Sequence, residues 1–138
     1  MARILAIDYG LKRVGIAVTD KLQLIATSLT TVETTGLLSF LEDYLRNEEV
    51  EKVVIGYPVD LSGNETDATP AVKKFIKLFQ NKFPDIHIVT IDERLTSRMA
   101  SRVIIESGLK KMKRREKELV DKVSATIILQ SYLEIHNR

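Results

Sequence analysis

The order of its apolar runs is the feature that most limits what this chain can fold into. Three short runs follow one another near the N-terminus, at residues 3–8, 14–19 and about 28–32, and predict an antiparallel three-stranded meander. Two further runs, at 52–56 and 87–92, each follow an amphipathic helical pattern, as parallel strands usually do. The chain therefore predicts an α/β domain in which helices flank a mixed five-stranded sheet.

The helices are predicted from apolar residues that recur at the spacing of one helical face. They are expected over about 36–49, from Thr69 as N-cap with Pro70 as first helical residue, over about 96–107, and over about 117–136. The segment from Gly108 to Lys117 has too little hydrophobicity to pack and is expected to be a basic loop. A chain of 138 residues fits a single domain over residues 1–138.

Composition excludes several classes of protein. No apolar run approaches the ~18 residues that a membrane helix needs. The chain has no Cys, which excludes a disulfide framework and a thiolate metal site. The N-terminal apolar stretch is short and is interrupted by Asp8, unlike that of a signal peptide. We therefore expect a cytoplasmic protein with no membrane partner.

The positive charge is concentrated in one segment. Residues 94–117 hold nine Lys or Arg and two Glu, a net charge of +7, whereas the rest of the chain carries −5. A local basic patch favours a polyanionic partner. The alternative is a charged helix and loop that are merely solvated.

Acids stand where apolar strands end. Asp8, Asp92 and Glu93 occupy such positions, and in α/β sheets this edge is the usual ligand site. Asp121 heads a helical stripe that continues through apolar residues at spacings of four, seven and eleven, namely Ala125, Ile128 and Tyr132. A carboxylate on a face that points to the core needs a partner, which is either a metal or a cation such as Lys122 or Arg94, unless Asp121 caps its own helix.

Clustered carboxylates without His or Cys are hard oxygen ligands, which suit Mg²⁺ or Mn²⁺ and not Zn²⁺. Two such ions could activate a water and stabilise the leaving oxygen of a phosphodiester. The hairpin IDYGLKRVGIAVTD places backbone amides and the cations Lys12 and Arg13 beside Asp8, where a phosphate could bind. Sugar kinases and actin-like ATPases begin with a similar hairpin, but they need a second domain that nothing in this chain supplies.

Four segments together resemble the YqgF family, also called RuvX, of Holliday junction resolvase-like or precursor 16S ribosomal RNA nucleases. They occur in the family's order and span nearly the whole chain: IDYGLKRVGIAVTD, VVIGYPVDLSG, IDERLTSRMA and DKVSATIILQSYL. The resemblance implies a ribonuclease H-like fold. It places the family's catalytic, metal-binding acids at Asp8, Glu93 and Asp121.

The resemblance also assigns residues 108–117 to a basic loop that meets phosphates. The expected nucleic-acid-binding cations of the chain are Lys12, Arg13, Arg94, Arg98, Lys110, Lys111, Lys113, Arg114 and Arg115. The chain departs from the family in the second segment, where GYPVDLSG stands in place of Gly-Leu-Pro followed by Leu-Asn and Asp-Gly. Tyr57, Asp60 and Ser62 therefore differ, and we assign the 57–69 loop no role.

Two functions remain open at this stage. The first is a metal-dependent endonuclease that acts on structured nucleic acid, either precursor 16S ribosomal RNA or a four-way DNA junction, as a monomer or weak homodimer with pre-ribosomal particles as partners. The second is a nucleic-acid-binding ribosome-maturation factor without catalysis, in which each acid would face its own cation. Fold and acids are common to both substrates, so sequence does not choose between RNA and DNA.

Overall fold

The computed structural model describes residues 2–58, 64–92 and 115–136, and for residues 92, 115–124 and 136 it describes the backbone alone. The elements, in chain order, are β1 (Arg3–Tyr9), β2 (Arg13–Thr19), β3 (Ala26–Glu33), the 3-10 turn η1 (Thr34–Gly36), α1 (Leu37–Asn47), β4 (Val50–Tyr57), α2 (Thr69–Lys82), β5 (His87–Asp92) and α4 (Arg115–His136). The helix predicted at 96–107 lies outside the described residues.

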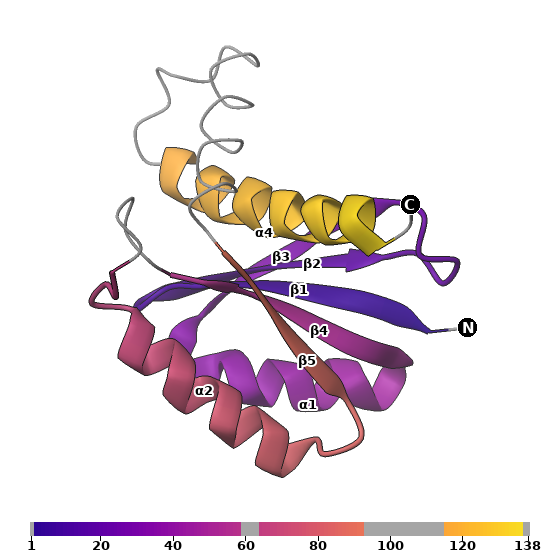
Figure 1. The fold of residues 1–138 in the computed structure, drawn as a ribbon, viewed down its shortest axis with the longest axis horizontal. Coiled ribbons are helices and arrows are strands. Elements are labelled where there is room, and N and C mark those ends of the chain that lie inside the picture. Colours follow the sequence, from indigo (N-terminus) through magenta and orange to yellow (C-terminus); the bar gives the residue numbers. More distant parts are fainter. Residues whose placement is uncertain (1, 59–63, 93–114, 137–138) are drawn as a thin grey trace.

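The strands form one five-stranded sheet in the order β3-β2-β1-β4-β5. The first three pair antiparallel, and β4 pairs parallel with both β1 and β5. The predicted meander and the two parallel strands are therefore confirmed. Because β1, β4 and β5 run in the same direction, their last residues meet at one edge of the sheet (Figure 1).

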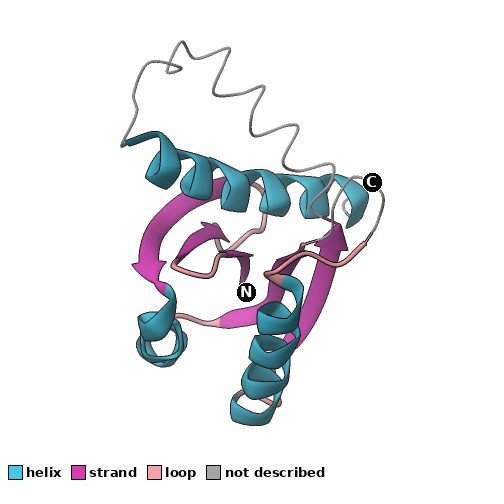
Figure 2. Cartoon of the chain, turned by 90° about the vertical axis from the view of Figure 1, so that its left-hand side faces the viewer, coloured by secondary structure: helices cyan, strands magenta, loops and turns pink. Residues whose placement is uncertain are grey.

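Each face of the sheet carries its own core, since side chains alternate along a strand. On one face, Leu5 and Ile7 of β1 pack with α1 and α2, whose buried residues include Leu41 and Phe79. On the other face, strand residues pack against Ala125, Ile128, Leu129, Tyr132 and Leu133 of α4. Figure 2 shows the sheet between α4 and the two other helices.

Helix α4 runs antiparallel to β4. The Nζ of Lys52, near the start of β4, donates a hydrogen bond of 2.6 Å to the hydroxyl of Tyr132, near the end of the helix. The first turn of α4 consequently lies at the edge where β1, β4 and β5 end (Figure 1). None of the described helices combines the length and the hydropathy that a bilayer-crossing segment requires.

One detail of the predicted helices is wrong, and two helices begin one or two residues from the approximate positions expected. Thr69 is not an N-cap: α2 begins at Thr69 itself, after Ala68, and the Thr69 hydroxyl is instead engaged by the preceding loop. Helix α1 begins at Leu37 because the residues before it form η1. Helix α4 begins at Arg115, so the last three residues of the expected basic loop continue the helix that packs on the sheet.

Candidate functional site

Asp8 lies one residue before the end of β1, on the face that α4 covers. Ile4 and Ala6 belong to the core beneath α4, and the two-residue alternation of a strand puts Asp8 on the same side. The three residues differ in exposure: Ile4 and Ala6 are buried, whereas Asp8 is half-buried. The carboxylate thus stands where the packed core gives way to the edge of the sheet.

Both strands next to Asp8 carry a glycine beside it. Gly15 of β2 is its direct partner in the sheet. On the other side, Ile7 pairs with Ile55 of β4, so Gly56 is the next residue along. Because glycine has no side chain, neither neighbouring strand places one against the Asp8 carboxylate on this face. Any side chain that packs against the carboxylate on this face therefore comes from outside these two strands.

The same row continues to β3, where Thr31 pairs with Gly15. The Thr31 hydroxyl oxygen is buried, and within the described part of the chain no group hydrogen-bonds to it. A buried hydroxyl without a partner costs stability. Thr31 lies two strands from Asp8. We call this row of the sheet, which consists of Thr31, Gly15, Asp8 and Gly56, the Asp8 row.

The turn between β1 and β2 is held closely at this edge. The Thr34 hydroxyl donates a hydrogen bond of 2.7 Å to the Gly10 carbonyl, and the Thr34 N–H donates one of 3.0 Å to the Lys12 carbonyl. A side chain at Gly10 would stand 2.3 Å from the carbonyl oxygen of Arg13, so only glycine fits there. The turn is thereby fixed beside Asp8, with Lys12 exposed.

Hydrogen bonds also join the described ends of the loop after β4. The Thr69 hydroxyl donates to the Pro58 carbonyl at 2.6 Å and accepts from the Thr66 N–H at 2.8 Å. These bonds join the end of β4 to the start of α2 across the 57–69 loop.

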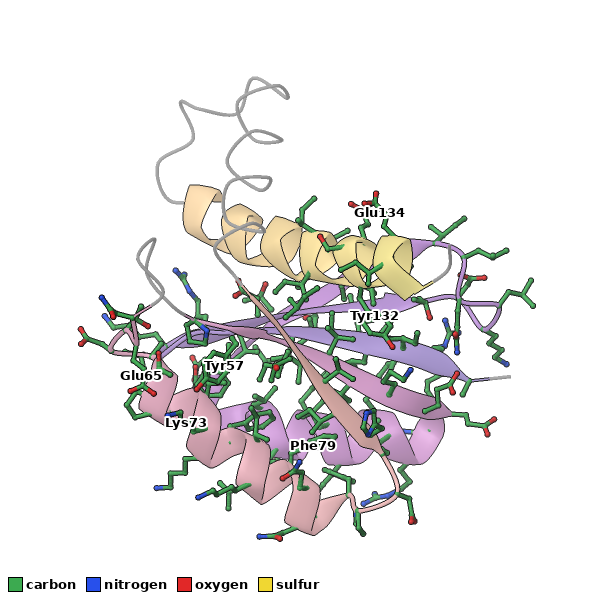
Figure 3. All side chains as sticks on the ribbon, viewed as in Figure 1. Tyr57, Glu65, Lys73, Phe79, Tyr132 and Glu134 are labelled. Carbon is green, nitrogen blue, oxygen red and sulfur yellow. The ribbon has the colours of Figure 1, made fainter. Side chains whose placement is uncertain are left out.

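A cluster of polar side chains flanks that loop. Figure 3 shows Tyr57, Glu65 and Lys73 together where β4 ends and α2 begins. The Glu65 carboxylate, and to a smaller extent Tyr57, raises the pKa of the Lys73 ammonium. Lys73 therefore stays charged at this edge of the sheet.

The three predicted metal ligands are described to different extents. Asp8 is placed as above, and Glu93 lies outside the described residues. The backbone of Asp121 belongs to α4, one helical turn before the buried Ala125, and its side chain is not described. The described side chains hold no group of three acids that could bind a metal, and two of the three predicted ligands are not among them.

Three of the nine predicted nucleic-acid-binding residues are among the described residues. Lys12 is exposed in the β1–β2 turn, and Arg13 is the half-buried first residue of β2. Arg115 is the first residue of α4. The remaining six lie outside the described residues: Arg94, Arg98, Lys110, Lys111, Lys113 and Arg114.

The sequence interpretation missed the neighbours of Asp8. Gly15 and Gly56 interrupt strands that are otherwise rich in β-branched residues, and such a glycine often marks a close approach by another group. That signal was present in the sequence. For Thr31 no sequence signal exists, because its place depends on the pairing of β3 with β2.

Solved structures that resemble this one share its fold across the whole chain. A fowlpox virus resolvase in complex with Holliday junction DNA superposes with a TM-score of 0.61 at 15% identity, covering 99% of each chain. RuvC of T. thermophilus with a Holliday junction substrate gives a TM-score of 0.56 at 15% identity, covering 99% of this chain and 97% of the other. The predicted ribonuclease H-like fold is confirmed.

Sequence relatives are much closer. A protein of Flavobacterium psychrophilum, named "Putative pre-16S rRNA nuclease", is 53% identical over 133 residues, which cover 96% of this chain and 97% of the relative. A protein of Porphyromonas gingivalis with the same name is 53% identical over the full length of both. The RuvX family, described as Holliday junction resolvase, matches residues 2–135. Because the family matches nearly every residue and relatives about half identical cover nearly the full length, the chain belongs to the RuvX family.

Proposed function

We propose that this chain is an endonuclease that depends on Mg²⁺ or Mn²⁺ and hydrolyses phosphodiester bonds in structured nucleic acid. Its substrate is precursor 16S ribosomal RNA, a four-way DNA junction, or both, in keeping with the names of its relatives. The observation that carries the proposal is the position of Asp8 between two glycines at the edge where the parallel strands end.

The chemistry of the available donors suits a hard divalent cation. The chain has no Cys, and His87 is exposed at the start of β5, the end of that strand farthest from the Asp8 edge. Carboxylates are therefore the donors on which a metal here would depend. Asp8 would hold the ion together with Glu93 and Asp121.

Two positional arguments favour these partners. Glu93 directly follows β5 in the sequence, and that strand ends at the Asp8 edge. Asp121 precedes Ala125 by one helical turn, and Ala125 is fully buried in that same core. Asp8 and Asp121 therefore belong to elements that meet at the Asp8 edge, and Glu93 follows in sequence a strand that ends there.

A bound ion would supply Lewis-acid stabilisation of the phosphate charge and a more acidic water for attack. The chain's own contribution is to fix the donors and to leave space for the phosphate. Gly15 and Gly56 provide that space, since they present no side chain beside Asp8. Lys12, in a turn held by Thr34, adds a positive charge next to it.

The segment 94–117 provides most of the positive charge for the nucleic-acid backbone. It joins the end of β5 to the start of α4, and both of these lie at the Asp8 edge. We extend the proposal to a cytoplasmic site of action on pre-ribosomal particles, by a monomer or weak homodimer.

The test is cleavage of labelled four-way junction DNA and labelled precursor 16S ribosomal RNA, side by side, with Mg²⁺, with Mn²⁺ and with chelator. We expect cleavage of at least one substrate with either ion and none with chelator. Binding of both nucleic acids without cleavage under every condition would contradict the nuclease proposal and favour the non-catalytic maturation factor.

A further inference from the structure

A pocket of about 250 Å³ opens on the other face of the sheet, directly beside the Asp8 edge. Tyr9, the residue after Asp8, forms one wall, and α1, α2 and η1 form the others. Successive residues of a strand point to opposite faces. The pocket and the Asp8 carboxylate are therefore on opposite faces of the sheet but only one residue apart along β1.

The walls suit a flat aromatic ligand. The rings of Tyr9 and Phe75 lie with their centroids 5.4 Å apart at 35° to each other, and the side chains of Leu37, Leu38 and Leu78 complete the apolar surface. Phe75 is buried behind the partly exposed ring of Tyr9, and a ring such as that of Tyr9 stacks on nucleobases of any sequence.

The rim of the pocket is polar and positive. The exposed Thr35 and Lys74 line it, together with Thr34, and none of the described residues that line it is an acid. Thr34 also holds the turn that carries Lys12. Positive charge beside an apolar slot matches a nucleotide, which pairs a flat base with an anionic phosphate.

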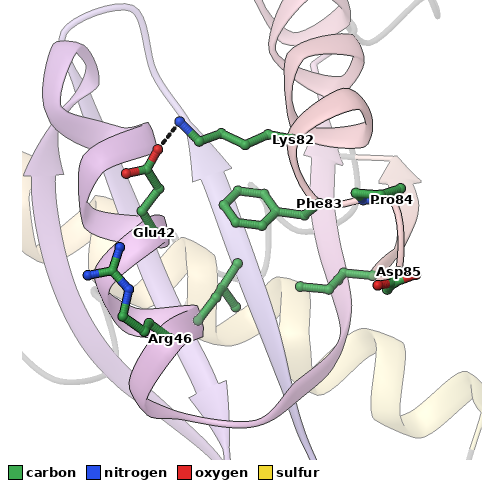
Figure 4. Close-up of a pocket in the computed structure, with 8 residues that line it drawn as sticks. Glu42, Arg46, Lys82, Phe83, Pro84 and Asp85 are labelled. Carbon is green, nitrogen blue, oxygen red and sulfur yellow. Dashed lines mark ion pairs between the residues drawn. The ribbon is translucent and has the colours of Figure 1, made fainter.

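A second cavity between α1 and α2 differs in the charge of its lining and in its location. It has a volume of about 360 Å³ and lies where α2 ends and before β5 begins, at the opposite edge of the sheet (Figure 4). Glu42 and Asp85 line it, and Lys82 forms an ion pair with Glu42 there. Arg46 and Lys82 balance the charge of these two acids, so the lining has no net positive charge, and the cavity is remote from Asp8.

We propose that the pocket beside Tyr9 binds one unpaired nucleobase of the nucleic acid whose phosphodiester lies at Asp8. The inference rests on the proposed function for the identity of the polymer. A base that leaves its stack at a junction or in a single-stranded segment enters between Tyr9 and the leucines, and Lys74 meets a neighbouring phosphate. Extrusion costs least where the base is already unpaired, which favours branched or single-stranded sites over duplex.

The test is a scan of a short single-stranded oligonucleotide in which an abasic site is moved one position at a time. Dissociation constants are measured by fluorescence anisotropy in chelator, so that no strand is cleaved. We expect binding to weaken about tenfold when the abasic site falls at the pocket, and little elsewhere. Equal affinity for every position would overturn the proposal and would favour an apolar side chain of a partner protein as the occupant.

Two filled-pocket variants provide the matched comparison. Ala71→Phe fills this pocket, and Ile86→Phe fills the cavity of Figure 4. We expect Ala71→Phe to abolish the dependence on the abasic position, because the base no longer enters, and Ile86→Phe to keep it. A positional dependence that survives in Ala71→Phe would also overturn the proposal.

A measurement on the unmodified protein guards against a variant that fails to fold. Adenosine monophosphate added to the isotope-labelled protein should shift the amide resonances of Thr35, Ala71 and Leu78 and leave those of Phe83 and Ile86 in place. Absence of shifts at the first three would contradict the pocket assignment. None of these measurements requires cleavage, so a protein that binds in this way but never cuts would refute the nuclease proposal alone.

Discussion

At the edge where β1 and β4 begin, side-chain hydrogen bonds join residues of the strands themselves, whereas at the edge where those strands end such bonds hold the adjoining turn and loop, and glycines flank Asp8 within the sheet. At the first edge, which we call the tied edge, the Ile4 N–H donates to the Thr19 hydroxyl at 2.9 Å and Arg3 donates to the Thr19 carbonyl at 2.9 Å. Arg3 also forms an ion pair of 3.3 Å with Glu48.

In the Asp8 row itself, glycine and threonine contribute less to packing and hydrogen bonding. Gly15 and Gly56 leave space where side chains could pack, and the Thr31 hydroxyl is buried without a partner among the described residues. Functional sites commonly give up stability in this way, because a site prepared for a ligand leaves its groups incompletely satisfied without it. The difference agrees with a stabilising role for the tied edge and with the proposal that the Asp8 edge binds a ligand.

The largest expected effect comes from Asp8→Asn. Cleavage should fall at least about a hundredfold, the scale on which removal of one preorganised electrostatic group lowers kcat. The dissociation constant for nucleic acid should change little, because the proposed role of Asp8 is to hold metal and not to contact the backbone. Asp85→Asn, in the exposed turn before β5, is the matched control. Unchanged cleavage in Asp8→Asn would end the metal-site proposal.

The basic segment should affect binding and not turnover. Replacing Lys113, Arg114 and Arg115 by Gln should flatten the plot of log affinity against log salt by up to ~0.9 for each duplex phosphate that is no longer neutralised. Turnover of bound substrate should change much less, since these cations meet neighbouring phosphates. Lys21→Gln with Arg46→Gln, two exposed cations near the tied edge, should leave the slope unchanged. Identical slopes in all proteins would mean that the segment is only solvated.

Thr19→Val tests the tied edge. It removes the acceptor of the buried Ile4 N–H and should lower the free energy of unfolding by roughly 1–3 kcal/mol. Urea denaturation measures this, and cleavage per folded molecule should be unaltered. Thr27→Val, at an exposed position of β3, controls for the change of side chain. A Thr19→Val protein as stable as the parent would contradict the role given to this hydroxyl.

Thr31→Val makes the same substitution in the Asp8 row, and the expected change in the free energy of unfolding has the opposite sign. The hydroxyl has no partner among the described residues, so its replacement by a methyl group should raise the free energy of unfolding by about 1 kcal/mol. The pair of variants is compared in one denaturation series. Destabilisation by both would show that the contrast between the two edges is wrong.

The smallest effect concerns Asp20, in the turn after β2 beside the tied edge. Its carboxylate accepts backbone N–H bonds from Ile25, Leu24 and Leu22, and these bonds lower its pKa below 3.8. The stabilisation is therefore present above pH 3.8 and is lost as the pH falls through the lowered value. Melting temperature against pH should decline slightly more steeply below this point for the parent than for Asp20→Asn. Superimposable profiles would refute the assignment.

The sequence by itself determined the elements and the candidate acids. Alternation and helical spacing are local properties, so the pattern at 87–92 predicts β5 as found, and the stripe Ala125, Ile128 and Tyr132 is buried as expected. Asp8 is recognisable because an acid ends an apolar run. The predicted N-cap role of Thr69 is wrong because a capping preference cannot reveal that the Pro58 carbonyl, eleven residues away, competes for the same hydroxyl.

Only the tertiary structure decided what stands beside Asp8. Strand register depends on pairing between distant segments, and a shift by one residue would have moved Gly15 and Thr31 to the other face. The direction of α4 also depends on tertiary packing. Tyr132 lies beside Lys52, and the first turn of the helix therefore lies at the Asp8 edge. Local patterns specify which residues can form a site, and long-range pairing specifies which of them meet.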